Sequence, residues 1–252
     1  MYRDLKDKNI ILTGGSGFLG KQILEAFKLS KSNIIILDIK KPKKSENVEY
    51  YRCDITKETE VKRVAKKITR KYRKIDILIN NAASDYVPKG KSGDFSLENL
   101  KLNIWKKDLN VGLDGSFICT KIFGSLMAAQ KKGVILNISS DLSIIAPNQD
   151  LYKSLNFIKP VTYSVVKQGI NGLTKYTAAY WADKNVRCNA IAPGGIFNNQ
   201  DRTFLKKIKK VIPLKRLAKK NEYNDLILFL CSDSSSYMTG SIVIADGGRT
   251  II

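Results

Sequence analysis

The sequence predicts an α/β fold in which helices cover both faces of a parallel sheet. Short apolar runs alternate with longer stretches of helical period from one end of the chain to the other. The runs are apolar throughout rather than at every second residue, which is typical of parallel strands buried on both faces. No change of composition divides the 252 residues, of which 43% are hydrophobic and 27% charged. We therefore expect one folded domain over residues 1–252.

Seven segments are the expected strands of this sheet, six of them apolar runs and one, residues 48–53, a weaker candidate. In chain order they cover residues 9–13, 33–38, 48–53, 75–80, 133–139, 186–192 and 241–246. Helical periodicity indicates helices after most of these strands. The expected helices cover residues 19–30, 58–72, 104–129, 163–183 and 222–231.

Three polar or irregular stretches follow strands, at residues 84–99, 141–162 and 198–210. Segments that follow parallel strands lie at the carboxyl edge of the sheet, where ligands bind in open α/β folds. Long loops inside compact domains are usually functional. We expect the functional site at this edge.

The charge balance is strongly basic, with 44 Lys and Arg against 23 Asp and Glu and a formal charge of +21. Such a charge raises nucleic acid or an anionic membrane as a partner. However, 35 of the 44 cations are lysines scattered over the predicted helices. Nucleic-acid readers rely on clustered Arg and interleaved aromatic side chains, which are absent here. We expect no nucleic-acid or membrane partner and favour an anionic small-molecule substrate.

The chain contains no histidine, which removes Ser-His-Asp and Cys-His chemistry and most catalytic zinc sites. Cys53, Cys119, Cys188 and Cys231 lie far apart without a CxxC pair, so we expect reduced thiols, a cytoplasmic location and no metal. The apolar run near the N-terminus, residues 10–12, is too short for a signal peptide.

A glycine-rich turn, TGGSGFLG, joins the first strand to the first helix. Gly14, Gly17 and Gly20 allow close approach of a pyrophosphate to the helix N-terminus. The second strand ends at Asp38, whose carboxylate is suited to the ribose hydroxyls of NAD and repels a 2′-phosphate. Lys40 and Lys41 follow directly and are suited to a 2′-phosphate, so NADP stays open as a less favoured cofactor.

Tyr163 and Lys167 lie four residues apart at the start of a predicted helix, on one face. A tyrosine serves as an acid or base near neutral pH when a cation stabilises its phenolate. Lys167 is placed to do so. A hydroxyl at the end of a neighbouring strand, from Ser139 or Ser140, is placed to orient a substrate carbonyl.

These residues resemble those of the short-chain dehydrogenase/reductase family. The matching segments occur in order along the whole chain: TGGSGFLG, CDI (53–55), NNAA (80–83), NISS (137–140), YSVVK (163–167), PGGIFN (193–198) and ADGG (245–248). The resemblance implies a Rossmann fold with a doubly wound, seven-stranded parallel sheet. It implies Tyr163 as the catalytic acid/base, Lys167 as the residue that lowers the pKa of Tyr163, and Ser140 as the residue that binds the reacting oxygen.

The resemblance also implies contacts with the cofactor, from Asp54 at the adenine, Asn81 at the adenosine ribose, and Pro193, Gly194 and Ile196 at the nicotinamide. The full implied set is Gly14, Ser16, Gly17, Phe18, Leu19, Asp38, Asp54, Ile55, Asn81, Ala82, Ala83, Tyr163, Lys167, Pro193, Gly194 and Ile196. Residues 104–131 and 163–183 resemble the helices that pair between subunits in this family, which implies a homotetramer or dimer.

The sequence departs from the family pattern in three places. The glycine spacing is TGxxGxxG, with Phe18 where a glycine is usual. Gly112 stands where a helix Asn usually anchors a water of the proton relay. The segment from Ser140 to Tyr163 is longer than usual. That insertion carries polar groups suited to a polyol and an anion: Asn148, Gln149, Asp150, Tyr152 and Lys153.

We hypothesise an NAD(P)-dependent oxidoreductase that moves hydride to or from an alcohol or ketone of a polar, anionic, sugar-derived metabolite. The insertion and the following helix resemble dehydrogenases of bacterial surface-sugar and nonulosonic-acid biosynthesis. Further candidates for substrate contact are Ser84, Asp85, Lys89, Lys91, Asn198, Asn199 and Arg202. The alternatives are a sugar-nucleotide epimerase or dehydratase without net redox change, which the glycine spacing favours, and a non-catalytic dinucleotide-sensing module.

Overall fold

The computed structural model describes residues 2–42, 47–84 and 94–252 and contains one sheet of seven strands. The strand order is β3-β2-β1-β4-β5-β6-β7, and every neighbouring pair is parallel. The chain starts near the middle of the sheet, winds to one edge and then to the other, so the order reverses between β1 and β4. The predicted doubly wound α/β fold is confirmed.

The strands follow the apolar runs closely. They are β1 (Asn9–Thr13), β2 (Asn33–Asp38), β3 (Val48–Arg52), β4 (Ile77–Asn80), β5 (Gly133–Ile138), β6 (Val186–Pro193) and β7 (Ile242–Ala245). The four residues of β4 and the five of β1 are all buried, whereas the edge strands β3 and β7 are only partly buried. Burial on both faces explains why the inner strands have no alternating pattern.

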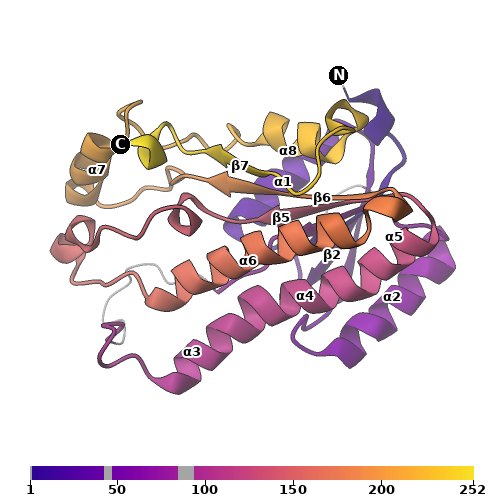
Figure 1. The fold of residues 1–252 in the computed structure, drawn as a ribbon, viewed down its shortest axis with the longest axis horizontal. Coiled ribbons are helices and arrows are strands. Elements are labelled where there is room, and N and C mark those ends of the chain that lie inside the picture. The colour runs from indigo at the N-terminus through magenta and orange to yellow at the C-terminus, as the bar shows by residue number, and fades with distance from the viewer. Residues whose placement is uncertain (1, 43–46, 85–93) are drawn as a thin grey trace.

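Helices form two layers (Figure 1), with α1 and α8 on one face of the sheet and the helices from α2 to α6 on the other. The helices are α1 (Phe18–Lys28), α2 (Glu58–Tyr72), α3 (Leu102–Leu109), α4 (Gly115–Cys119), α5 (Ser125–Ala129), α6 (Val161–Tyr180), α7 (Arg202–Ile208) and α8 (Asn224–Cys231). Two π-helical turns, Asn110–Asp114 and Thr120–Gly124, join α3, α4 and α5 into one long helix.

Two regions expected to be irregular contain short helices. α7 lies within the polar stretch 198–210, where Asp201 accepts a hydrogen bond from the Phe204 amide (3.0 Å) and caps the helix. The insertion after β5 contains three 3₁₀ turns, Asp141–Ser143, Gln149–Leu151 and Lys153–Leu155. Both regions lie at the carboxyl edge of the sheet.

Within the described residues, one helix, Leu102–Ala129, is long and apolar enough to cross a membrane by length and composition alone. More than half of its most apolar stretch is buried inside the protein. Cys119, Phe123 and Met127 are fully buried in the core beside the sheet. We therefore interpret its apolar character as that of a core helix.

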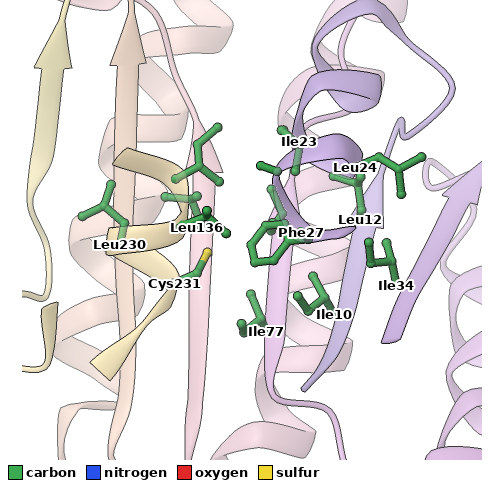
Figure 2. Packing of buried hydrophobic residues seen from close by; sticks show 14 of the residues in the cluster. Ile10, Leu12, Ile23, Leu24, Phe27, Ile34, Ile77, Leu136, Leu230 and Cys231 are labelled. Carbon is green, nitrogen blue, oxygen red and sulfur yellow. The ribbon is translucent and has the colours of Figure 1, made fainter. Parts of the chain in front are cut away.

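Each face of the sheet has its own hydrophobic core. Figure 2 shows the core beneath α1 and α8, where Phe27 and Ile23 of α1 pack on Ile10 and Leu12 of β1. On the other face, α2 contributes Val61, Val64, Ala65 and Ile68, spaced as one face of a helix. These cores fix the strands and hence the positions of the loops at the carboxyl edge.

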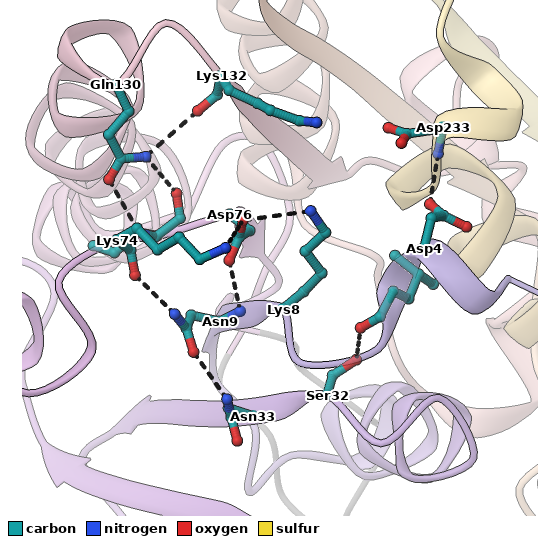
Figure 3. Close-up of polar contacts among 12 residues, drawn as sticks. Asp4, Lys8, Asn9, Ser32, Asn33, Lys74, Asp76, Gln130, Lys132 and Asp233 are labelled. Atoms are coloured by element: carbon teal, nitrogen blue, oxygen red, sulfur yellow. Dashed lines mark hydrogen bonds and ion pairs between the residues drawn. The ribbon is translucent and has the colours of Figure 1, made fainter.

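A polar cluster secures the opposite, amino edge of the sheet (Figure 3). Asp76, just before β4, accepts a hydrogen bond from the Asn9 amide (2.9 Å) and pairs with Lys8 and Lys74 at 3.6 and 3.5 Å. The side chain of Asn9 joins Lys74 to Asn33 at the start of β2. This cluster holds the starts of the inner strands in register and lies away from the candidate site.

Candidate active site

A cleft of about 950 Å³ lies at the carboxyl edge of the sheet, between the turn after β1 and the insertion after β5. Every residue predicted from the sequence to serve catalysis or the cofactor lines this cleft. They are Gly14, Ser16, Gly17, Phe18, Leu19, Asp38, Asp54, Ile55, Asn81, Ala82, Ala83, Ser140, Tyr163, Lys167, Pro193, Gly194 and Ile196. The fold thus brings motifs from the whole length of the chain together around one cleft.

The glycine-rich turn packs directly against the segment that follows β4. Gly14 has φ +66°, and a Cβ on it would lie 2.8 Å from the Cα of Ala82, so a side chain is excluded by backbone conformation and by space. The Asn81 side-chain amide donates to the carbonyls of Thr13 and Gly14, each at 3.0 Å. Asn81 therefore fixes the shape of the turn in addition to lining the cleft.

Asp38 lies at the end of β2, facing the same turn. Its two carboxylate oxygens accept hydrogen bonds from the backbone amides of Ser16 and Lys40, both at 2.9 Å. These two bonds orient the carboxylate and leave acceptor capacity on both oxygens. Lys40 also lines the cleft, whereas Lys41 is not among the described residues that line it.

Asp54 and Ile55 follow β3 and form the far wall. One carboxylate oxygen of Asp54 accepts hydrogen bonds from the amide and the hydroxyl of Thr56, at 3.1 and 2.7 Å. The Ile55 side chain fills the space where a Cβ on Gly115 would stand, at 2.6 Å. The loop is therefore anchored both within itself and against α4.

Ser140, Tyr163 and Lys167 lie together where β5 ends and α6 begins. Lys167 is buried, its ammonium donates to the carbonyl of Ile138 (2.7 Å), and its Nζ lies 5.8 Å from the centroid of the Tyr163 ring. The spacing of four residues places both side chains on one face of α6.

Ser140 is held by its neighbour in sequence. Its hydroxyl donates to Asp141 (2.9 Å) and accepts from the Leu142 amide (3.1 Å), and the same carboxylate pairs with Arg249 at 2.7 Å. Asp141 and Arg249 are both nearly inaccessible to solvent. This pair was not predicted from the sequence, because nothing in the pattern connects residues that lie 108 positions apart.

Ser139 has a different environment from Ser140. Its hydroxyl donates to the side-chain oxygen of Asn171 (2.7 Å) and contacts the hydroxyl of Ser143 (3.0 Å), and all three side chains are buried. This network ties the end of β5 to α6. The sequence left open whether Ser139 or Ser140 orients the substrate. The Ser139 hydroxyl is used in hydrogen bonds inside the protein.

The insertion after β5 contacts the cleft differently from what we expected. Asp150 and Lys153 form an exposed ion pair with each other, and Asn148 accepts from the Asp150 amide within its own turn. Neither these three residues nor Gln149 are among those that line the cleft. The expectation is wrong for these four residues because their side chains bond groups of the insertion itself, and of that set Tyr152 lines the cleft.

Lys159 and a group of aromatic rings occupy this part of the wall instead. The Nζ of Lys159 lies 3.8 Å from the centroid of the Tyr163 ring. Gln149 holds Lys159 by bonding both its backbone amide (3.0 Å) and its carbonyl (2.9 Å). Tyr152 packs on Phe157 and Phe204, with ring centroids 5.8 and 5.5 Å apart. No feature of the sequence distinguishes Lys159 from the many other lysines of the chain.

The other polar residues predicted to contact the substrate do not all line the cleft. Asn198 and Asn199 line the cleft, and Arg202 is not among its described lining residues. Ser84 lines a small cavity behind Tyr163. Asp85, Lys89 and Lys91 lie outside the described residues.

Within residues 2–42, 47–84 and 94–252, no group of three or more Cys, Asp or Glu side chains is arranged to hold a metal ion. All four cysteines are buried free thiols. Acid/base groups and backbone amides are therefore the chemical resources that the described wall of the cleft offers.

A doubly wound sheet with a glycine-rich turn after β1, and with Ser140, Tyr163 and Lys167 at the same edge, defines an α/β oxidoreductase. Residues 19–250 match the family described as enoyl-(acyl carrier protein) reductase. Together with the relatives below, this match shows that the chain belongs to the short-chain dehydrogenase/reductase family.

The similar proteins span almost the whole chain. A 3-oxoacyl-[acyl-carrier-protein] reductase of Thermotoga maritima is 33% identical over 98% of this chain and 99% of its own length. An NAD-dependent glycerol dehydrogenase of Listeria innocua is 32% identical (98% and 96%), and post-translational flagellin modification protein A of Campylobacter coli is 28% identical (97% and 98%). A crystal structure of a short-chain dehydrogenase from Leptospira borgpetersenii with bound NAD⁺ has a TM-score of 0.89 at 30% identity, covering 99% of this chain and 96% of that one.

Proposed function

We propose that this protein is an NAD-dependent dehydrogenase or reductase that acts on a secondary alcohol or ketone of a polar, anionic, sugar-derived metabolite. The observation that carries the substrate class is the ammonium of Lys159 over the ring of Tyr163. It gives the cleft a second cation, in addition to Lys167, beside the proposed acid/base.

The cleft fits a dinucleotide. Gly14 and Gly17 of the glycine-rich turn line the cleft and have no side chains, and the turn leads into the N-terminus of α1, which is a ready binding site for a pyrophosphate. The oriented carboxylate of Asp38 suits a pair of ribose hydroxyls and repels a 2′-phosphate. The NAD⁺ in the Leptospira structure supports the same cofactor here. Lys40 beside Asp38 keeps NADP as the less favoured choice.

A bound nicotinamide would supply the hydride acceptor or donor for the substrate carbon. Tyr163 takes the proton of the substrate hydroxyl during oxidation and returns it during reduction. Lys167 stabilises the phenolate. Ser140 binds the reacting oxygen by turning its hydroxyl proton from Asp141 to that oxygen, while its Oγ still accepts a hydrogen bond from the Leu142 amide.

The wall around Tyr152, Phe157 and Phe204 offers aromatic faces, and Lys159, Asn198 and Asn199 offer polar groups. Such a combination suits a sugar ring with an anionic substituent better than an acyl chain. The glycerol dehydrogenase among the relatives supports a polyol, and the flagellin modification protein supports a role in surface modification. The narrower assignment to surface-sugar biosynthesis rests on these likenesses.

The decisive experiment measures NADH formation with matched neutral and anionic polyols, for example glycerol and glucose beside gluconate and glucose 6-phosphate. We expect Tyr163→Phe to abolish turnover while NADH still binds, as measured by calorimetry. Retained turnover in this variant would remove Tyr163 from its role.

Lys159→Met tests the substrate class. We expect kcat/KM to fall at least about tenfold for the anionic substrates, the loss of one charged contact, and much less for the neutral ones. Lys153→Met is the matched control, because Lys153 lies in the same insertion but pairs with Asp150 away from the cleft. Equal losses for both substrate classes would contradict an anionic substrate.

An epimerase or dehydratase that returns its hydride is the second candidate, favoured by the TGxxGxxG spacing of the turn. Net NADH formation with substrate separates the two, because such reactions leave the amount of NAD unchanged.

We further propose that the enzyme works in the cytoplasm as a homotetramer or dimer. The four free thiols support a reducing compartment.

A further inference from the structure

Arg249 is a buried cation that lines the cleft, and the proposed reaction does not otherwise use it as a contact for the substrate. It lies at the start of the 3₁₀ turn Arg249–Ile251, after β7. The side chain of Asp246 fixes this turn, because its two carboxylate oxygens accept hydrogen bonds from the backbone amides of Gly248 (2.8 Å) and Thr250 (2.7 Å). The backbone around Arg249 is therefore held in place before any substrate binds.

The Arg249 guanidinium bonds a single protein group. It donates to Asp141 at 2.7 Å, and no other acceptor bonds it within residues 2–42, 47–84 and 94–252. In the same part of the chain, the fully enclosed side-chain atoms that lack a partner belong to Asn80, Ser96 and Ser164, so the other Arg249 nitrogens are not enclosed. A guanidinium carries five N–H groups in one plane. Most of these donors are thus available to a molecule in the cleft that Arg249 lines.

These donors lie close to the proposed reacting centre. One carboxylate oxygen of Asp141 accepts from Arg249, and the other accepts from the Ser140 hydroxyl at 2.9 Å. A single carboxylate group therefore separates the guanidinium from Ser140. A substrate whose reacting oxygen is bound at Ser140 has the oxygens of its nearby carbons within reach of Arg249.

The charge of the pair indicates which kind of group binds there. The side chains of Arg249 and Asp141 are 8% and 4% exposed, and their two charges balance each other. A carboxylate or phosphate on the same guanidinium would bring an unbalanced negative charge next to the buried Asp141, which is costly. A hydroxyl oxygen accepts a hydrogen bond without adding a charge. The pair is therefore suited to a neutral hydroxyl, whereas the proposed function assigns the anionic substituent to Lys159.

We propose that Arg249 is a specificity-determining residue that donates a hydrogen bond to a second hydroxyl of the substrate. This inference rests on the proposed dehydrogenase function and assigns the recognition of a polyol to one residue. A site built to bind a hydroxyl rejects an analogue that lacks it, because the buried donor is then left without its partner. Arg249 selects polyols against simple secondary alcohols, and Lys159 selects anionic polyols against neutral ones.

The test compares two arginine variants. Arg249→Lys keeps a cation beside Asp141 but lacks the planar fork of N–H groups. Arg216→Lys is the matched control, because Arg216 also pairs with a carboxylate, that of Glu222, and is not among the described residues that line the cleft. NADH formation is measured with glycerol and 2-propanol, and with glucose and its monodeoxy analogues. The members of each series differ only in their hydroxyl groups.

We expect the unmodified protein to prefer glycerol over 2-propanol, or glucose over one of its deoxy analogues, by at least about tenfold in kcat/KM, the loss of one hydrogen bond to a charged donor. This preference should fall to about threefold or less in Arg249→Lys and stay unchanged in Arg216→Lys. An effect of Arg249 through Ser140 alone lowers kcat/KM for every substrate and preserves the preference. A preference that persists in Arg249→Lys would therefore overturn the proposal.

A crystal structure of Tyr163→Phe with NAD⁺ and glycerol or glucose gives a readout without turnover. We expect one hydroxyl oxygen of the polyol within hydrogen-bonding distance of the Arg249 guanidinium, which keeps its contact with Asp141. A polyol bound without this contact would contradict the role of Arg249 and leave the proposed function standing. If the unmodified protein oxidises no polyol and this crystal binds none, the proposed function fails and this inference fails with it.

Discussion

At the scale of single residues, the buried pair between Arg249 and Asp141 links the end of the chain to the proposed reacting centre. Arg249 donates a hydrogen bond to the Asp141 carboxylate, which also accepts a hydrogen bond from the Ser140 hydroxyl. Removing the arginine leaves a buried carboxylate without its counter-ion, which costs about 3–5 kcal/mol. We expect Arg249→Met to lower the free energy of unfolding by this amount and to lower kcat by releasing Ser140. Urea unfolding and steady-state kinetics measure the two effects.

Arg216→Met is the control for that prediction. Arg216 forms a two-point pair with Glu222, but both side chains are a third or more exposed. The Arg216 guanidinium, which donates hydrogen bonds to Glu222, lowers the pKa of that carboxyl to about 2. An exposed pair contributes little to stability because solvent screens it, so we expect a much smaller loss for Arg216→Met than for Arg249→Met. Equal losses in the two variants would show that burial of the Arg249 pair does not matter.

The cysteines give a prediction about pH. Burial raises the pKa of Cys53 to about 11 and that of Cys231 to about 12, and it raises the pKa values of Cys119 and Cys188 as well. Because the folded-state pKa values lie above the ordinary value of 9, the folded protein holds protons that the unfolded chain releases. The stability that this provides is present below pH 9 and is lost as the pH rises toward 11 and 12.

We therefore expect no thiol to react with Ellman's reagent at pH 7.5 in the native protein, and all four to react in guanidinium chloride. The free energy of unfolding, measured by urea titration, should fall between pH 9 and 11. Rapid reaction of a native thiol would contradict the burial of that cysteine.

At the scale of elements, the crossing of the long helix and α6 depends on the absence of a side chain at Gly112. Val166 is β-branched and cannot turn away easily, so a Cβ at 112 forces the helices apart. We expect Gly112→Ala to lower the free energy of unfolding by about 1–3 kcal/mol, which is typical of overpacking. We also expect a lower kcat, because Tyr163 and Lys167 lie on α6 and move with it. Thermal unfolding measures the first effect.

Val166→Ala provides the check on this crossing. Combined with Gly112→Ala it removes the clashing methyl group, so the double variant should be more stable than the sum of the two single changes. Strict additivity of the two losses would mean that these residues do not press on each other.

The elements also show what the sequence could predict. The inner strands are recognisable because burial on both faces requires continuous apolar runs, and α2 was predicted with its observed ends because its apolar face repeats regularly. α7 was missed because seven residues leave too short a pattern. The cleft residues were predictable where local motifs carry them, as at Gly14 and Tyr163, whereas the contacts of Lys159 and Arg249 depend on tertiary packing that leaves no local pattern.

At the scale of the whole molecule, exposed aromatic residues on the outer helices support an assembly of several chains. Tyr176 and Tyr180 of α6 stack on each other with 68% and 62% exposure, and Phe117 of the neighbouring helix α4 is 51% exposed. Exposed apolar groups on a helix pair are typical of an interface. We expect analytical ultracentrifugation to give a dimer or tetramer of the 28.3 kDa chain.

Tyr176→Lys combined with Tyr180→Lys should shift this assembly toward smaller species, because charge repulsion and desolvation then oppose pairing of the two surfaces. The double variant Lys209→Ala and Lys210→Ala, on another part of the surface, is the control. A monomer for the unmodified protein, or an unchanged mass for the tyrosine variant, would contradict a role of this surface.

The excess of positive charge acts on the whole molecule through its long-range field. A formal charge of +21 raises the local concentration of anions around the cleft and accelerates their association, an effect that salt screens within about 10 Å at 0.1 M. We expect kcat/KM for an anionic polyol to fall on the order of tenfold between about 0.02 and 0.5 M KCl, and that for glycerol to change little. Lys159→Met should lower kcat/KM for the anion at every salt concentration while preserving most of the salt dependence, because it removes one of 44 cations and the rest of the field remains. A salt dependence shared equally by glycerol and the anion would show instead that salt acts on the cofactor or on the assembly.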